Sequence, residues 1–253
     1  MFSLSTTRID ALPHQIEAVY DRVLPAHEQR FLIADDTGLG KTIMAGMVVK
    51  ELNARGRANR VLIVCPAPLT RQWVRELREL FDLEFTRYDS AFLKTLRSSI
   101  SPDGNPWYRH NWVVTSLDLI KKDDISIELG KTKWNLVIFD GAHKCKAYKY
   151  GDKIERTNRY KIAAKLSSYD CADNVLLLTA TPHDGTPYPF FALLQLLDPY
   201  IAQDEYSIDP KRRQNIIIRR LKEDCTDWQG NPLFPDRHVK SISVKYPKGK
   251  VST

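Results

Sequence analysis

A glycine-containing loop between an apolar run and a helical pattern is the part of this sequence whose residues best suit a chemical task. Residues 31–34 are apolar, the loop reads Asp35-Asp36-Thr37-Gly38-Leu39-Gly40-Lys41-Thr42, and apolar residues at helical spacing follow. Glycines let backbone N–H groups turn toward phosphate oxygens, and the new helix presents its positive end to them. A lysine here reaches the β- and γ-phosphates, and the threonine hydroxyl binds Mg²⁺. The loop therefore predicts a site for a nucleoside triphosphate with Mg²⁺.

The match to the phosphate-loop pattern is not perfect, because Asp35 stands where the strict pattern has its first glycine. A second Gly-Lys-Thr occurs at residues 130–132, after a polar segment and without an apolar run before it. We interpret this second copy as a loop with no phosphate role, since the flanking strand and helix are what give the first copy its meaning.

A metal-binding carboxylate is expected at Asp140, the last residue of the apolar run 136–140. An aspartate at the end of a buried strand coordinates Mg²⁺ through water, and it would complete the metal site that Thr42 begins. Taken alone, Asp140 could equally be a strand-end cap. The phosphate loop upstream makes the metal role the better interpretation.

Gln15, in Leu12-Pro13-His14-Gln15, precedes the phosphate loop by about one helix. A glutamine amide donates and accepts hydrogen bonds at once, and so it suits the edge of an adenine. The alternative is an exposed glutamine at the start of a helix, and the residue by itself favours that alternative.

Two further apolar runs also end in polar residues. Cys65-Pro66-Ala67-Pro68-Leu69-Thr70-Arg71 follows one strand, and its loop lies where parallel sheets place ligands, so Thr70 or Arg71 could contact nucleic-acid phosphates. We interpret the nearby Trp73 as a packing residue. Thr179 and Thr181 follow the other strand, and their hydroxyls could bond the loop of Asp140 and His143 and sense the γ-phosphate. Two threonines at such a place are more often structural.

The order of apolar runs and helical segments predicts an α/β fold with a mainly parallel sheet and helices on both faces. Runs rich in Val, Ile and Leu, apolar on both sides, indicate strands covered from both faces. The predicted strands are 31–34, 61–65, 112–116, 136–140 and 175–179, the predicted helices are 13–23, 42–53, 69–81, 161–168 and 189–197, and the predicted loops include 99–106 and 151–158.

Composition restricts the class of protein. With 43% hydrophobic and 27% charged residues the chain is an ordinary globular protein, and its net charge of +7 suits a polyanionic partner or a solvated basic surface. The four cysteines form no C-x-x-C pair, which argues against a metal site or disulfide framework and favours the reducing cytoplasm. No secretion signal is evident, and no apolar run approaches the ~20 residues that cross a bilayer, so no membrane partner is expected.

Taken together, the motifs resemble the first motor lobe of a superfamily 2 helicase-like ATPase of the Swi/Snf type, most similar to its bacterial remodeller and defence-helicase relatives. The resemblance is carried, in the family's order, by residues 12–15, 35–42, 65–69 with Gln72 and Trp73, 114–116, 140–143, 178–182 and 219–222. It implies a RecA-like P-loop NTPase lobe over residues 1–200, and a basic exit segment toward a second lobe over residues 201–253.

The resemblance also implies roles for individual residues. Gln15 would read adenine, residues 37–42 would hold the phosphates of ATP, and Thr42 and Asp140 would hold Mg²⁺. Asp140 and His143 belong to the acidic DEAH-type box, and Thr179 and Thr181 would couple it to the nucleotide. The track for nucleic acid, expected to be double-stranded DNA, would be lined by Pro66, Ala67, Pro68, Thr70, Thr115 and Ser116.

Two departures from the family pattern stand out. Gly141 occupies the place of the box glutamate that orients and deprotonates the attacking water. The second RecA-like lobe, which supplies arginines worth roughly 10³–10⁵ in rate, would have to follow residue 240, and about a dozen residues remain. We therefore expect a lobe that binds ATP and hydrolyses it poorly alone, with a separately encoded second lobe as a possible partner.

Two other functions compete with this one. The chain could be a non-enzymatic nucleotide- or DNA-binding module left by truncation or a split gene. It could also be a P-loop kinase or metabolic ATPase, but Thr-Ala-Thr-Pro at 179–182 and Cys-Pro-Ala-Pro at 65–68 argue against that.

Overall fold

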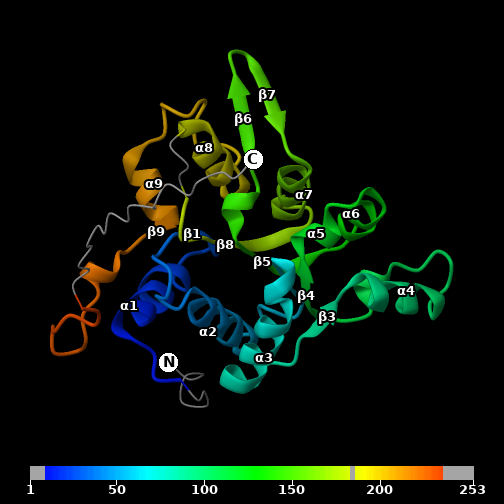
Figure 1. The fold of residues 1–253 in the computed structure, drawn as a ribbon, viewed down its shortest axis with the longest axis horizontal. Helices are drawn as coiled ribbons and strands as arrows, with labels where there is room; N and C mark the ends of the chain where they lie inside the picture. The colour runs from blue at the N-terminus through cyan, green and yellow to red at the C-terminus, as the bar shows by residue number, and fades with distance from the viewer. Residues whose placement is uncertain (1–8, 183–185, 236–253) are drawn as a thin grey trace, which may run out of the picture.

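A parallel β-sheet forms the centre of the molecule, as the computed structural model shows for the residues it describes, 9–182 and 186–235 (Figure 1). Within them seven strands lie in the order β3-β4-β2-β5-β8-β1-β9, and all neighbours run parallel. The strands are β1 (Arg30–Ile33), β2 (Val61–Cys65), β3 (Thr86–Tyr88), β4 (Trp112–Ser116), β5 (Trp134–Asp140), β8 (Ala172–Leu178) and β9 (Ile217–Ile218). The predicted α/β fold class is confirmed.

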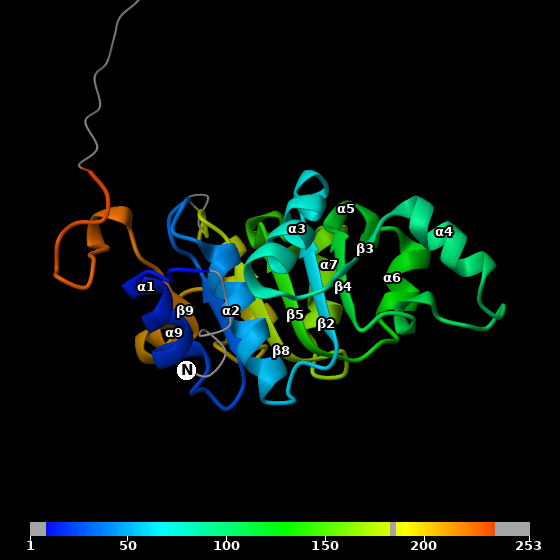
Figure 2. The same cartoon turned by 90° about the horizontal axis from the view of Figure 1, so that it is seen from below.

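Helices cover both faces of the sheet (Figures 1 and 2). On one face lie α1 (Pro13–Ile16), which continues as a wider π-helix over Glu17–Val23, α2 (Lys41–Ala54) and α3 (Thr70–Phe81). The other face carries α4 (Ser90–Ser98), α5 (Leu117–Ile120), α6 (Asp123–Leu129), α7 (Asn158–Ser167) and α8 (Pro187–Leu197). Helix α9 (Pro210–Ile216) packs beside β9 and β1 at the sheet edge.

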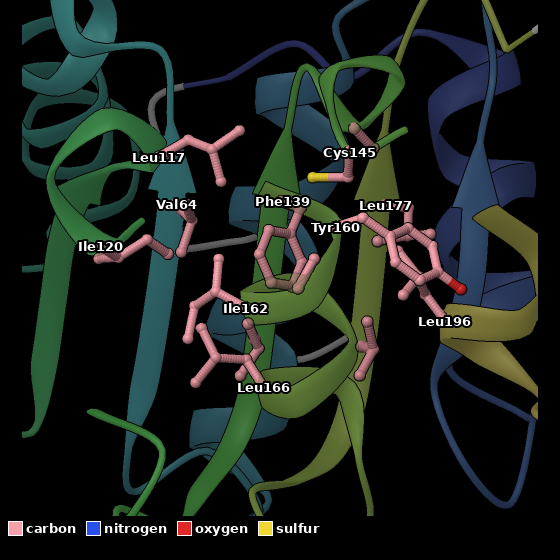
Figure 3. Close-up of a cluster of buried hydrophobic side chains, with 14 of the residues drawn as sticks. Val64, Leu117, Ile120, Phe139, Cys145, Tyr160, Ile162, Leu166, Leu177 and Leu196 are labelled. Atoms are coloured by element: carbon pink, nitrogen blue, oxygen red, sulfur yellow. The ribbon is translucent and has the colours of Figure 1, made fainter. Parts of the chain in front are cut away.

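The core consists of two apolar layers because successive strand residues point to opposite faces. Leu136 and Ile138 of β5 join the layer under α2 and α3, whereas Val137 and Phe139 join the layer under α7 and α8. Figure 3 shows Phe139 between Val64 and Leu177, with Ile162 and Leu166 of α7 below them in the view. This packing fixes the positions of the central strands relative to one another, and therefore also the positions of their carboxyl ends.

Several elements differ from the sequence-based expectation. The segment 151–158, predicted as a loop, contains strand β7 (Lys153–Arg156), which pairs with β6 (Ala147–Tyr150) in an antiparallel hairpin. Its residues are almost all exposed, so no apolar alternation marked it. Strand β9 was not expected either, since two residues give no periodic signal and its partner β1 lies far away in sequence. Helix α4 has a recognisable start, because the Asp89 carboxylate accepts from the Phe92 N–H at 2.9 Å.

The second Gly-Lys-Thr ends a helix rather than starting one. Gly130 is the C-terminal cap of α6, and the Thr132 side chain is buried. Its interpretation as a loop without a phosphate role is consistent with this place in the fold, since the positive end of a helix is what attracts an anion.

Within the described residues none of the helices has the length and apolar content needed to span a lipid bilayer. All four cysteines are buried as free thiols. The predicted exit segment, 201–253, lies partly outside the described residues; its described part contributes α9 and β9 to the edge of the sheet.

Candidate functional site

The predicted site residues gather at the carboxyl edge of the sheet because their strands are neighbours in it. Leu178 of β8 is in register with Asp140 of β5 on one side and with Ile33 of β1 on the other. The Thr179 N–H donates to the Ile33 carbonyl at 3.0 Å, so the loops that follow these three strands start side by side. Parallel α/β sheets bind ligands at this edge.

The phosphate loop has the backbone geometry that its glycines predict. Gly38 and Gly40 have φ values of 89° and 80°, in the left-handed region that glycine adopts without strain. Helix α2 begins at Lys41, and its N-terminal cap Gly40 has no side chain to satisfy the first-turn N–H groups. Those donors, with the Thr42 hydroxyl in the first turn, suit the phosphates and Mg²⁺ of a nucleotide.

The Lys41 side chain folds back over the loop, and backbone carbonyls of the loop bind its ammonium group. Its Nζ donates to the carbonyls of Asp35 and Asp36 at 2.7 and 2.9 Å. Burial lowers the pKa of Lys41, and the carboxylates of Asp35, Asp140 and Asp36 oppose that shift. Lys41 thus lies at the phosphate loop within the electrostatic influence of the strand-end Asp140.

Gln15 and His14 hold the loop from α1. The His14 Nε2 and Gln15 Nε2 atoms contact the Leu39 carbonyl at 3.1 and 3.2 Å, and the Gln15 Oε1 accepts from the Leu12 N–H at 3.1 Å. Gln15 is buried, which contradicts the exposed alternative. A Cβ at position 40 would collide with the Gln15 amide in its present position, so a side chain there would displace that amide from the Leu39 carbonyl.

Arg220 joins the end of the described chain to this loop, a contact that sequence reasoning missed. Its guanidinium pairs with Asp35 at 2.7 Å, lies 3.7 Å from Glu17, and donates to the His14 carbonyl. The backbone adds to this, because the Arg220 N–H donates to Asp35 and its carbonyl accepts from the Asp36 N–H. Asp35, the residue in the place of the first glycine, thus serves to anchor the exit segment.

Asp140, the predicted metal ligand, is oriented by Trp73. The indole Nε1 donates to the Asp140 Oδ2 at 3.0 Å, and the indole is 2% exposed. The interpretation of Trp73 as a packing residue is therefore incomplete. Its N–H fixes one carboxylate oxygen and leaves the other for a ligand.

Gly141 has a φ of +71°, and a Cβ there would lie in ordinary contact with Pro66, 3.5 Å from its Cγ. The position offers room for a side chain but a backbone conformation that glycine prefers. With glycine present, no carboxylate is available at this point of the acidic box.

His143 connects the acidic box to the end of β8. Its Nδ1 and the Thr179 Oγ1 share a hydrogen bond of 2.9 Å, and the Thr179 Oγ1 accepts from the Thr181 N–H at 3.1 Å. Burial, with Lys144 and Lys146 nearby, lowers the pKa of His143, so the neutral ring is favoured. The predicted bond between the Thr179 hydroxyl and this loop is present.

Comparison with known proteins decides the family. The model of the SNF2-related domain matches residues 14–243. The chain belongs to the SNF2-related domain family. The RNA polymerase-associated protein RapA of Serratia proteamaculans is 36% identical over 193 residues, 76% of this chain and 19% of that protein. RapA of Yersinia pseudotuberculosis is 37% identical over 194 residues, with the same coverage. The chain thus spans about a fifth of the length of these relatives.

Solved structures share the fold of this SNF2-related domain. The Sulfolobus solfataricus SWI2/SNF2 ATPase core in complex with dsDNA aligns with a TM-score of 0.65 at 18% identity, over 85% of this chain and 45% of that one. The Pyrococcus furiosus Hef helicase domain aligns with a TM-score of 0.53 at 22% identity, over 79% and 36%. The resemblance to a Swi/Snf-type first lobe is confirmed.

The predicted nucleic-acid residues of this SNF2-related domain divide into two groups. Ala67 and Pro68 are exposed, and Pro66 and Ser116 are half-buried. Thr70 and Thr115 are buried instead, with hydroxyls that donate to the Ala67 and Tyr88 carbonyls at 2.9 and 3.1 Å. Thr70 at the start of α3 and Thr115 within β4 therefore bond to the backbone from buried positions and are not exposed to a passing strand.

A cavity of about 480 Å³ opens beside the phosphate loop of the SNF2-related domain. Its lining includes Thr37 of the loop and Lys222 and Phe234 of the exit segment. The Lys222 Nζ lies 3.6 Å from the point where a Gly38 side chain would begin, and 5.4 Å from the centre of the Phe234 ring. A second cation, missed by sequence reasoning, therefore lies at the mouth of the loop.

Proposed function

We propose that this chain is the ATP-binding lobe of a DNA-dependent translocase of the SNF2 family, and that it binds ATP–Mg²⁺ but hydrolyses it poorly by itself. The observation that carries the proposal is the convergence of the phosphate loop, Asp140 and the His143–Thr179 pair at one edge of the sheet. Membership of the SNF2-related family supports it.

Each residue has a definite task in this proposal. Lys41 and the first-turn N–H groups of α2 hold the β- and γ-phosphates, and Thr42 and Asp140 are the Mg²⁺ ligands. Bound Mg²⁺ neutralises charge on the phosphate oxygens. Gln15 holds the loop through the Leu39 carbonyl and borders the place of the base, and Thr179 and Thr181 connect the acidic box to the nucleotide.

Poor hydrolysis follows from two features. Gly141 offers no carboxylate to align the attacking water, a role commonly worth roughly 10²–10⁴ in rate. The second feature belongs to the proposal itself: the arginines that stabilise charge on the γ-phosphate come from a second RecA-like lobe, and this chain aligns with 45% of the Sulfolobus ATPase core. We propose a separately encoded or covalently following second RecA-like lobe as the partner, in the cytoplasm.

Double-stranded DNA is the proposed nucleic acid. The Sulfolobus neighbour is described in complex with dsDNA, and this chain has a net charge of +7. The exposed turn at Ala67 and Pro68, with Pro66 and Ser116, is the proposed contact, and Thr70 and Thr115 support it from beneath.

The proposal is tested by calorimetric titration with ATP–Mg²⁺ and by anisotropy with labelled duplex DNA over a salt series. ATP–Mg²⁺ binding and a duplex affinity that falls steeply with salt are expected, since phosphate contacts release counterions. Absence of ATP binding would overturn the proposal. Nucleotide binding with no duplex binding at low salt would favour the alternative, a nucleotide-binding module without a DNA track.

A further inference from the structure

The β6–β7 hairpin is a part of the molecule that the nucleotide site does not use. It starts three residues after Lys144, the end of the short helix that contains His143, and projects past α7 and α8 away from the sheet (Figure 1). Gly151 turns the chain with a φ of +58°, and Tyr150 pairs with Lys153 across a two-residue turn. Among the described residues, each of these two strands pairs only with the other.

One face of the hairpin is fastened to the body of the lobe. Ala147 is buried against the core, and the Lys149 Nζ lies 3.1 Å from the Glu205 carboxylate and 5.8 Å from the centre of the Tyr188 ring on α8. These contacts fix the direction of the hairpin, so its other face has a defined orientation.

The other face carries a flat aromatic surface. Directly paired residues of an antiparallel hairpin point to the same side, and so Tyr148 and Tyr150 share a face with Lys153 and Glu155. The two tyrosine rings are stacked with centroids 6.3 Å apart at 27°. Tyr150 is 63% exposed. Tyr148, two residues further from the turn, is half-buried. Exposed aromatic surface of this kind is found at binding sites.

The charge around this surface is strongly positive. Residues 144–161 contain seven Lys or Arg against two Asp or Glu. Lys149 and Arg159 are paired, with Glu205 and Asp118. Lys153 and Arg156 are exposed, and the described part of the chain provides no acidic partner for either. Lys153 shares the face of the two tyrosines, whereas Arg156, which pairs with Ala147, lies on the opposite face and adds only to the positive charge around the hairpin.

We propose that the β6–β7 hairpin binds an unpaired nucleic-acid strand, with bases stacked on Tyr148 and Tyr150 and a phosphate on Lys153, which pairs directly with Tyr150. Stacked aromatic side chains within a basic surface are how proteins hold single strands without sequence preference. A duplex keeps its bases stacked inside and offers only phosphates to such a surface. The inference rests on the nucleic-acid partner of the proposed function and adds a second contact, for single strands, to its duplex track.

The hairpin binds DNA or RNA by the same chemistry, and the experiment separates the two. The full chain is titrated, by fluorescence anisotropy, against a labelled 20-nucleotide oligothymidine, its uridine equivalent and a blunt DNA duplex. Y148A/Y150A is expected to weaken single-strand binding by about tenfold or more, because base–aromatic stacking is worth roughly 1–3 kcal/mol per base. Duplex binding should change by less than about twofold.

Further variants separate the contribution of the aromatic rings to single-strand binding from the contribution of the positive charge. Y148F/Y150F keeps the rings and should retain single-strand affinity. K153A should weaken it and reduce the slope of log affinity against log salt by about 0.7, the value for one single-strand phosphate contact. The matched controls Y169A and K122A/K131A, exposed side chains outside the hairpin, should change little. Circular dichroism and thermal unfolding should match the parent, since the substituted side chains lie outside the core.

The outcomes distinguish this inference from the proposed function. Unchanged oligothymidine and oligouridine affinity in Y148A/Y150A would overturn the hairpin site and leave the duplex track intact. Equal losses for single strand and duplex would overturn base stacking in favour of a phosphate contact. Displacement of the oligonucleotides by polyglutamate at equal charge concentration would show a surface for acidic polypeptides instead. If the parent chain bound neither single strands nor duplex, both the nucleic-acid part of the proposed function and the hairpin site would be refuted.

Discussion

The guanidinium of Arg220 lies 2.7 Å from the fully buried carboxylate of Asp35, 185 residues earlier in the chain. This pair connects the segment that leaves the lobe with the first turn of the phosphate loop. The Arg220 N–H donates to the Asp35 carboxylate and its carbonyl accepts from the Asp36 N–H, so the exit segment is bonded to the phosphate loop through both side chain and backbone.

Arg220→Ala should destabilise the fold by about 3–5 kcal/mol, because it removes the ion-pair partner of the buried Asp35 carboxylate. ATP–Mg²⁺ affinity should fall with it. Urea unfolding and calorimetric titration measure the two effects. Arg219→Ala is the control, since Arg219 is exposed. Equal effects of the two substitutions would show that the pair has no special role. Asp35→Asn combined with Arg220→Met should recover part of the loss.

Lys41→Ala should weaken ATP–Mg²⁺ binding several-fold or more, since a hydrogen bond to a charged group is worth about 1.5–3 kcal/mol. Lys131→Ala should leave binding unchanged, because Lys131 follows the C-terminal end of α6 instead of starting a helix. Calorimetric titration of both variants compares the two Gly-Lys-Thr sequences. The assignment of the phosphate site is refuted by similar losses at the two lysines.

Trp73→Phe should raise the Mg²⁺ concentration required for nucleotide binding by about tenfold. This is the lower end of the roughly 10–100-fold loss of metal affinity that follows removal of a group orienting a metal ligand. The ring is kept, but the donor to the Asp140 Oδ2 is removed. Binding of ATP measured in EDTA should not change. Trp112→Phe is a matched control, because that indole donates to the Ala58 carbonyl at 3.1 Å, away from the site. A shift of equal size in both variants would indicate a general packing effect.

Gly141→Glu alone should restore little hydrolysis, for two reasons. The φ of +71° disfavours any side chain there by roughly 1–2 kcal/mol, and the second lobe is still required. Gly141→Glu with that lobe supplied in trans or by fusion should give DNA-stimulated phosphate release. Gly141→Ala separates backbone strain from the carboxylate. Rapid DNA-stimulated hydrolysis by the unmodified chain would show that another residue replaces the glutamate.

Acidification should destabilise the fold through His110. Its Nδ1 lies 2.9 Å from the Tyr88 hydroxyl, and burial, followed by the charge of Arg109, lowers its pKa. A basic group whose pKa is lower in the folded state is held neutral there. Its contribution is therefore intact above the unfolded pKa of about 6.5 and is lost as pH falls from there through the folded value.

Urea unfolding at pH 7.5 and at pH 5 measures this dependence. The difference in unfolding free energy between the two pH values should be smaller in His110→Gln than in the parent. If this free-energy difference were the same in His110→Gln and in the parent, His110 would not be the cause of the pH dependence. His27→Gln is the control, since His27 is exposed.

The sequence by itself determined the features that depend on neighbours along the chain. The apolar runs of the central strands, the glycines of residues 38 and 40 and the start of α2 are local signals, because backbone sterics and helix termini act within a few residues. The order of the motifs was enough to predict the parallel α/β lobe and its family, and the family match confirms this.

Only the tertiary structure decided which distant residues meet. Trp73 contacts Asp140 because β2 and β5 are neighbours in the sheet, and Arg220 contacts Asp35 because β9 lies beside β1. The same order puts β3 beside β4, which buries Thr115 under the Tyr88 carbonyl. Such contacts depend on strand order, which joins residues far apart in sequence, and no local pattern of residue types records which strands will be neighbours.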